Sequence, residues 1–153
     1  MLSRTAEYLY WISRYMERAE TTARLLDVGY RMSLFPNPSG YNNEWESVLS
    51  AAGAIEGYKN KYDTIEQKNV EDYLFFDESN PSSVYNCILN ARNNALVVRT
   101  SFTPESWLAI NKTYQEILNL KEKKFSKSDL PDLTEWTIEQ VNLFRGSLSS
   151  LLR

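Results

Sequence analysis

The chain has 153 residues, 42% of them hydrophobic and 24% charged, with a formal net charge of -3 and a pI near 5.1. These fractions are typical of a soluble globular protein, and the length predicts one domain over residues 1–153. The acidic balance argues against nucleic-acid binding, which needs a clustered positive field. The sequence contains no histidine, which excludes histidine metal sites, Ser-His-Asp and Cys-His nucleophile systems, and imidazole acid–base catalysis.

The single cysteine, Cys87, cannot form an intramolecular disulfide. The N-terminus reaches Glu7 without an apolar signal-peptide core, and no apolar run approaches the roughly 20 residues that cross a membrane. We therefore expect a cytoplasmic protein with no membrane partner. Carboxylates that could bind metal lack the Glu-x-x-His signature of helical di-iron sites, so we expect no metal and no cofactor.

Capping residues and apolar residues at helical spacing predict an all-α fold, a bundle of about six helices with a long N-terminal helix. Ser3 is the expected cap of the first helix, and Thr64-Ile-Glu-Gln67 matches a capping box. Pro81 is expected in the first turn of a helix that Ser82 or Ser83 caps, and Thr103-Pro104 opens the next helix. The predicted helices cover residues 3–32, 43–57, 64–76, 81–101, 103–123 and 132–153.

Basic residues are divided unusually along the chain. Five arginines and no lysine occur in the first 31 residues, whereas all eight lysines fall between Lys59 and Lys127. Arginine offers a planar fork of donors for fixed ion pairs and aromatic stacking, and lysine is a mobile, strongly hydrated charge. The first helix, which also carries Trp11 opposite its apolar stripe, is therefore predicted to hold fixed contacts on more than one side.

Two arginines interrupt the apolar face predicted for residues 81–101. Arg92 and Arg99 are seven residues apart and fall in the middle of that stripe. A buried, unpaired charge costs several kcal/mol, so carboxylates must face these arginines. We predict that the first helix supplies them and forms an interhelical Arg–Glu network. The candidate carboxylates are Glu7, Glu17, Glu20 and Asp27.

The run from Leu2 to Leu26, with Glu17-Arg18 at its centre, resembles the bacterial alpha-E domain family, a helical group named for its Glu-Arg pair. Shorter patches at residues 80–83, 91–95, 98–99, 105–107 and 111 are similar too. The resemblance implies a helical fold, usually in tandem duplication, and a genomic setting with ATP-grasp ligases and transglutaminase-like proteins. It assigns no catalytic residue. The residues that it singles out as candidates for a ligand site or ion-pair network are Arg4, Trp11, Arg14, Glu17, Arg18, Arg24, Arg92, Arg99, Glu105 and Asn111.

Two interpretations of these residues stay open. The arginines and Glu17 either form a structural network that sets helix register, or they hold a carboxylate or phosphate bidentately. We accordingly expect a non-catalytic interaction or accessory module of a peptide synthesis or modification system. Its partner would be an ATP-grasp-type ligase or a transglutaminase-like protein. The alternative is an enzyme or anion-binding domain that uses Glu17 with Arg14, Arg18 or Arg92.

By the same resemblance, we expect the chain to correspond to a single copy of the usual tandem pair. If the two copies normally pack together, one copy leaves an apolar face uncovered, which predicts a homodimer unless the chain is a truncated product. The last predicted helix is the expected source of that face, through Trp136, Leu143, Phe144, Leu148, Leu151 and Leu152.

Overall fold

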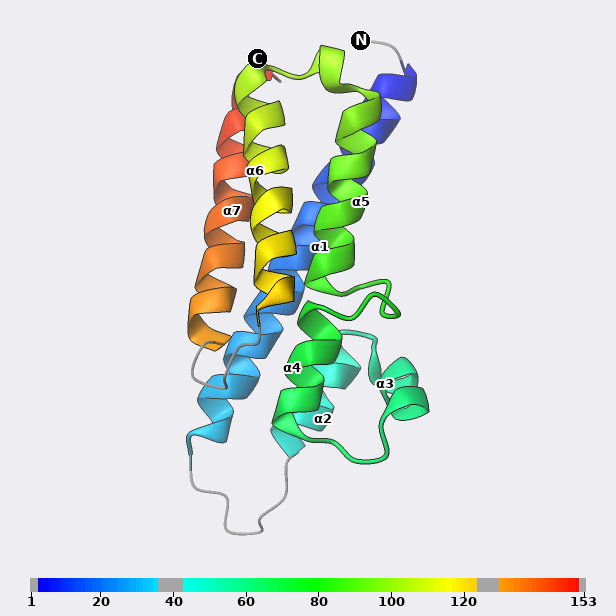
Figure 1. The fold of residues 1–153 in the computed structure, drawn as a ribbon, viewed down its shortest axis with the longest axis vertical. Helices are drawn as coiled ribbons and strands as arrows, with labels where there is room; N and C mark the ends of the chain where they lie inside the picture. The colour runs from blue at the N-terminus through cyan, green and yellow to red at the C-terminus, as the bar shows by residue number, and fades with distance from the viewer. Residues whose placement is uncertain (1–2, 36–42, 124–129, 152–153) are drawn as a thin grey trace.

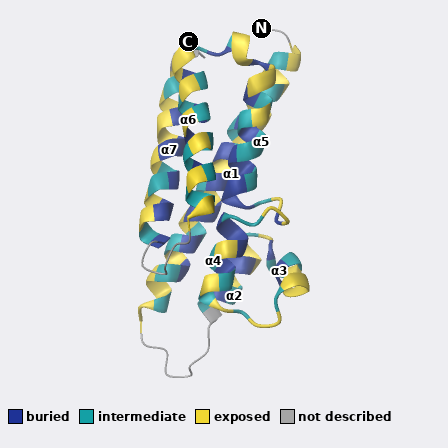
Figure 2. Cartoon of the chain, in the orientation of Figure 1, coloured by how far each residue is buried: buried dark blue, intermediate teal, exposed yellow. Residues whose placement is uncertain are grey.

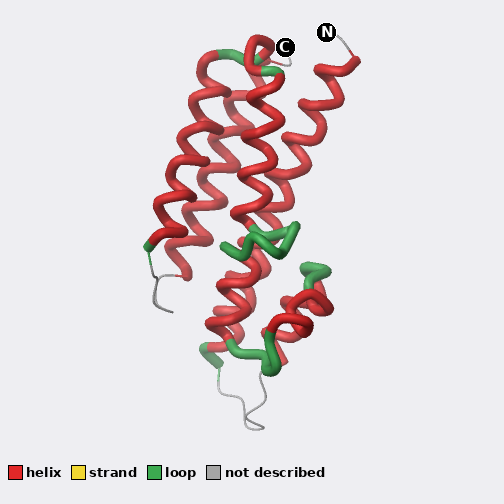
Figure 3. The backbone as a smooth tube through the Cα atoms, turned by 45° about the vertical axis from the view of Figure 1, so that its right-hand side comes forward, coloured by secondary structure: helices red, strands yellow, loops and turns green. Residues whose placement is uncertain are grey.

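The computed structural model describes residues 3–35, 43–123 and 130–151 (Figure 1). The prediction of an all-α fold with a long N-terminal helix is confirmed, and this part of the chain contains no strand (Figure 3). It has seven α-helices and one 3-10 turn. They are α1 (Ser3–Ser33), α2 (Asn43–Ala51), α3 (Ile55–Lys61), α4 (Gln67–Phe75), α5 (Val84–Val97), η1 (Arg99–Ser101, the 3-10 turn), α6 (Pro104–Glu122) and α7 (Leu130–Leu151).

The long helices form an up-and-down four-helix bundle. α1 packs against α5 and α7, and α6 packs against the same two helices, so α1 and α6 lie on a diagonal. Helices that follow one another in the bundle run antiparallel (Figure 1). The short helices α2, α3 and α4 lie between α1 and α5 in the sequence, and α2 and α4 pack against α1 at the lower end of the bundle.

Two hydrophobic cores follow from this arrangement, and α1 contributes to both. The upper core lies inside the four-helix bundle, where Ile12 and Met16 of α1 meet Ala91, Ala95, Ile110, Val141 and Phe144. The lower core joins Ala19 and Leu26 of α1 to Trp45, Leu49, Tyr58, Leu74, Ile88 and Ile117. Figure 2 shows the middle of α1 largely in the colour of buried residues, where it passes between its neighbours.

The close approach of α1 and α2 depends on a glycine. Gly29 is buried on α1, and a Cβ placed there would lie 2.7 Å from Cζ3 of Trp45 and 2.8 Å from Cγ2 of Val48. Any side chain at this position would therefore overlap two core residues of α2. Gly29 fixes how closely α2 packs on α1.

The region between α2 and α4 differs from the prediction. Gly53 takes a φ of 67°, which favours glycine, and ends α2, after which Ile55–Lys61 forms a separate helix that the sequence analysis missed. The prediction of a capping box at Thr64 is wrong. Glu66 is the N-cap residue of α4, and it makes no side-chain hydrogen bond to the first turn of that helix. Instead the buried Tyr58 hydroxyl donates to the Thr64 carbonyl at 2.7 Å and accepts from the Glu66 amide at 3.2 Å.

The loop before α5 is held by side-chain amides. Asn80, which is buried, donates to the Tyr73 carbonyl at 2.9 Å, and Asn86 donates to the carbonyls of Glu78 and Asn80 at 2.9 and 2.8 Å. Ser83 caps α5, as expected, by accepting from the Asn86 amide at 3.1 Å. Pro81 precedes the helix and is not in its first turn. The patch at residues 80–83 therefore has a structural role.

A pair of glycine substitutions tests the packing of α1 on α2. We expect Gly29→Ala to lower the free energy of unfolding by about 1–3 kcal/mol, because the new methyl group overpacks the Trp45 contact. Gly146→Ala is the matched control, since Gly146 is also inside a helix but a Cβ there meets nothing within 4 Å.

The control should stabilise the protein by about 0.5–1 kcal/mol through helix propensity alone. Urea unfolding of both variants beside the parent protein measures the two effects. Equal effects of the same sign at the two positions would contradict the close approach at Gly29.

Candidate functional site

The side of α1 that faces away from both cores is exposed along most of the helix. We call it the outer stripe, and it comprises Tyr10, Trp11, Arg14, Arg18, Thr21, Val28 and Met32. Tyr10 is 56% exposed and Trp11 46% exposed, and their rings form an edge-on pair with centroids 5.3 Å apart. Val28 and Met32 are each 54% exposed. The predicted second face of the first helix therefore exists, but it faces solvent for much of its length.

The side chains of Glu17 and Arg18 point toward different sides of α1. Glu17 is half exposed, lies 3.4 Å from Nη1 of Arg14, and lines a cavity of about 130 Å³ between α1 and α7. Arg18 is exposed, and its charge acts on the thiol of Cys87 on α5. Burial raises the pKa of Cys87 to about 12, and Arg18 offsets this only in part. The thiolate is therefore negligible at neutral pH.

Glu20 makes the ion pair that joins α1 to α7. Its Oε1 accepts from Nη2 of Arg145 at 2.7 Å, while its Oε2 accepts from Nη2 and Nε of Arg24 at 3.0 and 3.3 Å. The Glu20 side chain is only 12% exposed. Burial alone would raise its pKa, but the hydrogen bonds from Arg145 and Arg24 outweigh burial, so the pKa lies below the usual value.

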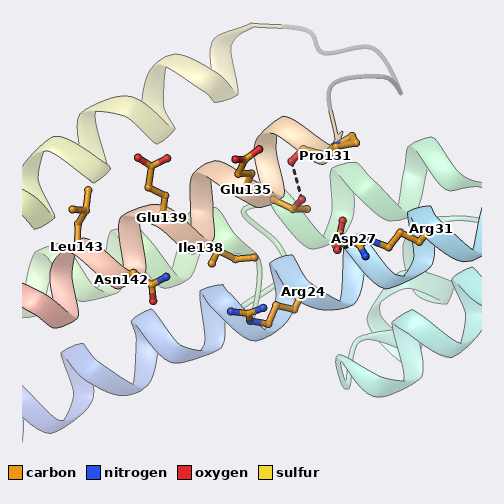
Figure 4. Close-up of a pocket in the computed structure, with 10 residues that line it drawn as sticks. Arg24, Asp27, Arg31, Pro131, Glu135, Ile138, Glu139, Asn142 and Leu143 are labelled. Carbon is orange, nitrogen blue, oxygen red and sulfur yellow. Dashed lines mark hydrogen bonds and ion pairs between the residues drawn. The ribbon is translucent and has the colours of Figure 1, made fainter.

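Below Glu20 the seam between α1 and α7 opens into a groove of about 820 Å³. Arg24, Asp27 and Arg31 line it from α1, and the Asp27 carboxylate pairs with Nε of Arg31 at 3.0 Å. Figure 4 shows Ile138 and Asn142 of α7 pointing toward α1, while Glu135 and Glu139 stand on the other side of α7. The groove therefore has a rim on α1 with two arginines and one aspartate, and a rim on α7 with two glutamates.

The predicted ion-pair network between α1 and the two arginines of residues 81–101 is wrong for the part of the chain that the structure describes. Arg92 is partly buried, but its guanidinium lies over the Tyr114 ring of α6, 4.7 Å from the centroid, and pairs with no described carboxylate. Its Nε and the Oδ1 of Asn111 on α6 are the buried side-chain atoms without a hydrogen-bond partner among these residues. A cation–π contact takes the place of the expected carboxylate.

Arg99 is not in a buried stripe at all. α5 ends at Val97, two residues earlier, and Arg99 begins the exposed 3-10 turn η1. The helical wheel drawn through Ser101 therefore placed it wrongly. Glu105 is exposed in the first turn of α6, where a carboxylate is favoured by the helix dipole, and Thr103 caps that helix as predicted.

The candidate residues are thus distributed over separate places. Arg4 is exposed and lies 5.9 Å from the centre of the Tyr8 ring. Arg14, Arg18 and Trp11 share the outer stripe, Glu17 lines the small cavity with α7, and Arg24 lines the groove. Whether these residues bind a ligand stays a prediction. The structure adds Arg145 and Tyr114, which the sequence analysis did not select. Arg145 recurs at helical spacing with Ile138 and Asn142 along one side of α7, and that spacing could have placed it beside α1.

Within residues 3–35, 43–123 and 130–151, no group of three His, Cys, Asp or Glu side chains is placed to hold a metal ion. None of the helices formed by these residues combines the length and apolar character needed to span a membrane.

Fold and site together define a helical domain, an up-and-down bundle with a three-helix insertion and an exposed arginine-rich first helix. The family model Alpha-E, described as a predicted alpha-helical domain with a conserved ER motif, matches residues 1–153. The chain belongs to the Alpha-E family. Glu17-Arg18 is the one Glu-Arg dipeptide in the sequence. No curated protein and no solved structure matches the chain.

The contribution of Glu20 is expected to depend on pH. Its lowered pKa means that its ion pairs stabilise the folded state above the unfolded value near 4.5 and that this contribution is lost as the pH falls through the lower folded value. At pH 7 we expect Glu20→Gln to cost about 1 kcal/mol of unfolding free energy, since neutral hydrogen bonds replace charge-assisted ones.

The matched control is Glu17→Gln, which removes a half-exposed carboxylate with one long contact and should cost less than about 0.5 kcal/mol. Urea unfolding of both variants at neutral and acidic pH measures the difference. A Glu20→Gln deficit that persists unchanged at acidic pH would contradict the assignment.

Proposed function

We propose that this chain is a non-catalytic helical interaction module, an accessory to a bacterial, cytoplasmic system of peptide synthesis or modification. Its partner would be an ATP-grasp-type ligase or a transglutaminase-like protein. That class of partner rests on the family resemblance and the genomic setting that it implies. The docking surface that we propose is the outer stripe of α1.

The observation that carries this proposal is the exposure of Tyr10 and Trp11. Large aromatic side chains are usually buried, and protein–protein contacts draw most of their energy from Trp, Tyr and Arg. Here a tyrosine and a tryptophan, each about half exposed, lie on the same helix face as Arg14 and Arg18. A surface of this composition supports docking of another protein more than it supports plain solvation.

The inner side of α1 makes the stripe a rigid surface. Both cores and the Gly29 contact hold the helix, which at 1.5 Å per residue is about 46 Å long. Side chains on it are displayed at fixed positions, so a partner gains contacts without ordering a flexible segment. The arginine-only composition of this helix fits that use.

The alternative, an enzyme or anion-binding domain, requires Glu17 and an arginine to act on one substrate. Arg92 does not share a site with Glu17, because it lies against Tyr114 of α6 whereas Glu17 lines a cavity with α7. Arg14, 3.4 Å from Glu17, and Arg18 remain on the exposed stripe. The separation of Arg92 from Glu17 therefore weighs against a single site that uses both of these residues.

The stripe is tested by affinity purification from the native cell with a doubly substituted chain, Tyr10→Ala with Trp11→Ala. We expect the parent chain to recover a ligase-like or transglutaminase-like protein, and the variant to recover at least about tenfold less, since loss of two aromatic anchors removes several kcal/mol of binding.

Leu108→Ala is the matched control, because Leu108 is 64% exposed on α6, away from the stripe, and its loss should leave recovery unchanged. Failure to recover either class of partner with the parent chain, or equal recovery with the double variant, would overturn the proposal.

We also propose that two copies of the chain pair through the groove between α1 and α7. The apolar face of the last helix, which the sequence predicted as the dimer contact, is largely buried inside the protein. Phe144 is buried in the upper core, and Leu148 packs against that core. Leu143 is 54% exposed and lines the groove, while the side chains of Leu151 and Leu152 lie outside the described residues. The rims of the groove support pairing, since Arg24 and Arg31 of one copy complement Glu135 and Glu139 of the other across a two-fold axis.

Charge reversal tests this pairing. We expect the parent chain to be dimeric by light scattering, the variant Glu135→Lys with Glu139→Lys to be monomeric because like charges then oppose, and an equal mixture with Arg24→Glu, Arg31→Glu to recover dimers. Glu56→Lys with Glu122→Lys changes the net charge equally at exposed positions outside the groove and should remain dimeric. A parent chain that stays monomeric at high concentration would defeat the proposal.

A further inference from the structure

The glutamate of the Glu-Arg motif, Glu17, contributes little to the stability of the fold. Glu17 is half exposed, and its described contact is the 3.4 Å approach to Arg14, three residues away on the same helix. Exposed pairs of this kind contribute little to stability. Glu20, one turn further on, carries the ion pairs that hold α7 in place. The presence of Glu17 in the motif is therefore better explained by the cavity that its side chain lines.

Glu17 faces the small cavity between α1 and α7. The volume is about 130 Å³, and the lining is Ser13, Met16, Glu17, Phe144, Arg145 and Leu148. A water molecule takes about 30 Å³ of liquid volume, so the cavity admits a molecule of only a few non-hydrogen atoms. Met16, Phe144 and Leu148 give it an apolar floor, and a carboxylate and a guanidinium stand at its walls.

These opposite charges do not neutralise each other. Glu17 and Arg145 line the same cavity, yet they form no ion pair within 4.0 Å. Arg145 gives one Nη2 donor to Glu20, and its Nε and Nη1 donate to no described residue. Its side chain is 47% exposed and that of Glu17 50%, so both can be reached from solvent. The Glu20 contact holds the guanidinium in position while leaving one edge of its fork unused.

We propose that this cavity binds a small α-amino acid in its zwitterionic form, independently of the docking surface on the outer stripe. The α-carboxylate accepts hydrogen bonds from the free edge of the Arg145 guanidinium, and the α-ammonium donates to the Glu17 carboxylate. The two opposite charges of the ligand, carried by groups bonded to the same carbon, bridge two protein charges that form no ion pair with each other. The apolar floor takes a methyl side chain.

The test is a titration of the isotope-labelled protein, followed by NMR, with L-alanine as the probe. We expect saturable shifts of the Ser13, Met16 and Phe144 resonances at millimolar L-alanine. Acetate and methylammonium each carry half of the recognised groups and should bind at least about tenfold more weakly.

Glu17→Gln should weaken L-alanine binding at least about tenfold while leaving thermal stability unchanged, and Glu56→Gln, at an exposed position on α3, should have no effect on binding. Arg145→Lys keeps the charge that holds Glu20 but loses the fork, so the protein should stay folded and binding should again weaken. Equal binding of acetate and L-alanine, unchanged binding in Glu17→Gln, or no saturable shift with L-alanine would each overturn the proposal. Because none of these variants touches Tyr10 or Trp11, failure here leaves the docking proposal standing.

Discussion

The structure depends on one constraint, which is that the long helix α1 is packed into both hydrophobic cores. The buried side of α1 runs from Ile12, inside the four-helix bundle, to Gly29, against α2. The lower core adds residues of α2, α3 and α4 to those of the four bundle helices, so a rotation or shift of α1 that changed its fit in one core would also change its fit in the other. Glu20 adds an ion pair to α7 between the two levels. All that the opposite side of α1 presents to solvent is positioned by this constraint.

Local signals in the sequence were sufficient for the class of fold and for the helix ends that side chains cap. Thr103 and Ser83 accept from backbone amides of the first turn, which is a short-range interaction that a sequence pattern encodes. The predicted cap at Thr64 failed because a distant residue, Tyr58, bonds to the backbone there. A tertiary contact of this kind leaves no local signature.

The candidate site was predictable only in part, and for a related reason. A helical wheel gives the direction of each side chain only if the helix continues, and α5 ends before Arg99. The wheel also cannot say which helix lies opposite. The requirement that a half-buried arginine find a partner was sound, but for Arg92 the partner is the Tyr114 ring of α6. Glu20, one of the four carboxylates expected to pair with the two arginines, instead meets Arg145, because the antiparallel bundle brings α7 to that flank of α1.

The Glu-Arg pair illustrates how adjacent residues acquire different surroundings on a helix shared in this way. Consecutive side chains point about 100° apart, so on a helix flanked by α7 on one side and α5 on the other they face different neighbours. Glu17 lines the cavity beside Arg145, whereas Arg18 lies on the side of Cys87. A single site formed by both residues would need a ligand that reaches around the helix. The geometry therefore favours two separate roles for the motif. Glu17 belongs to the cavity between α1 and α7, and Arg18 belongs to the exposed outer stripe.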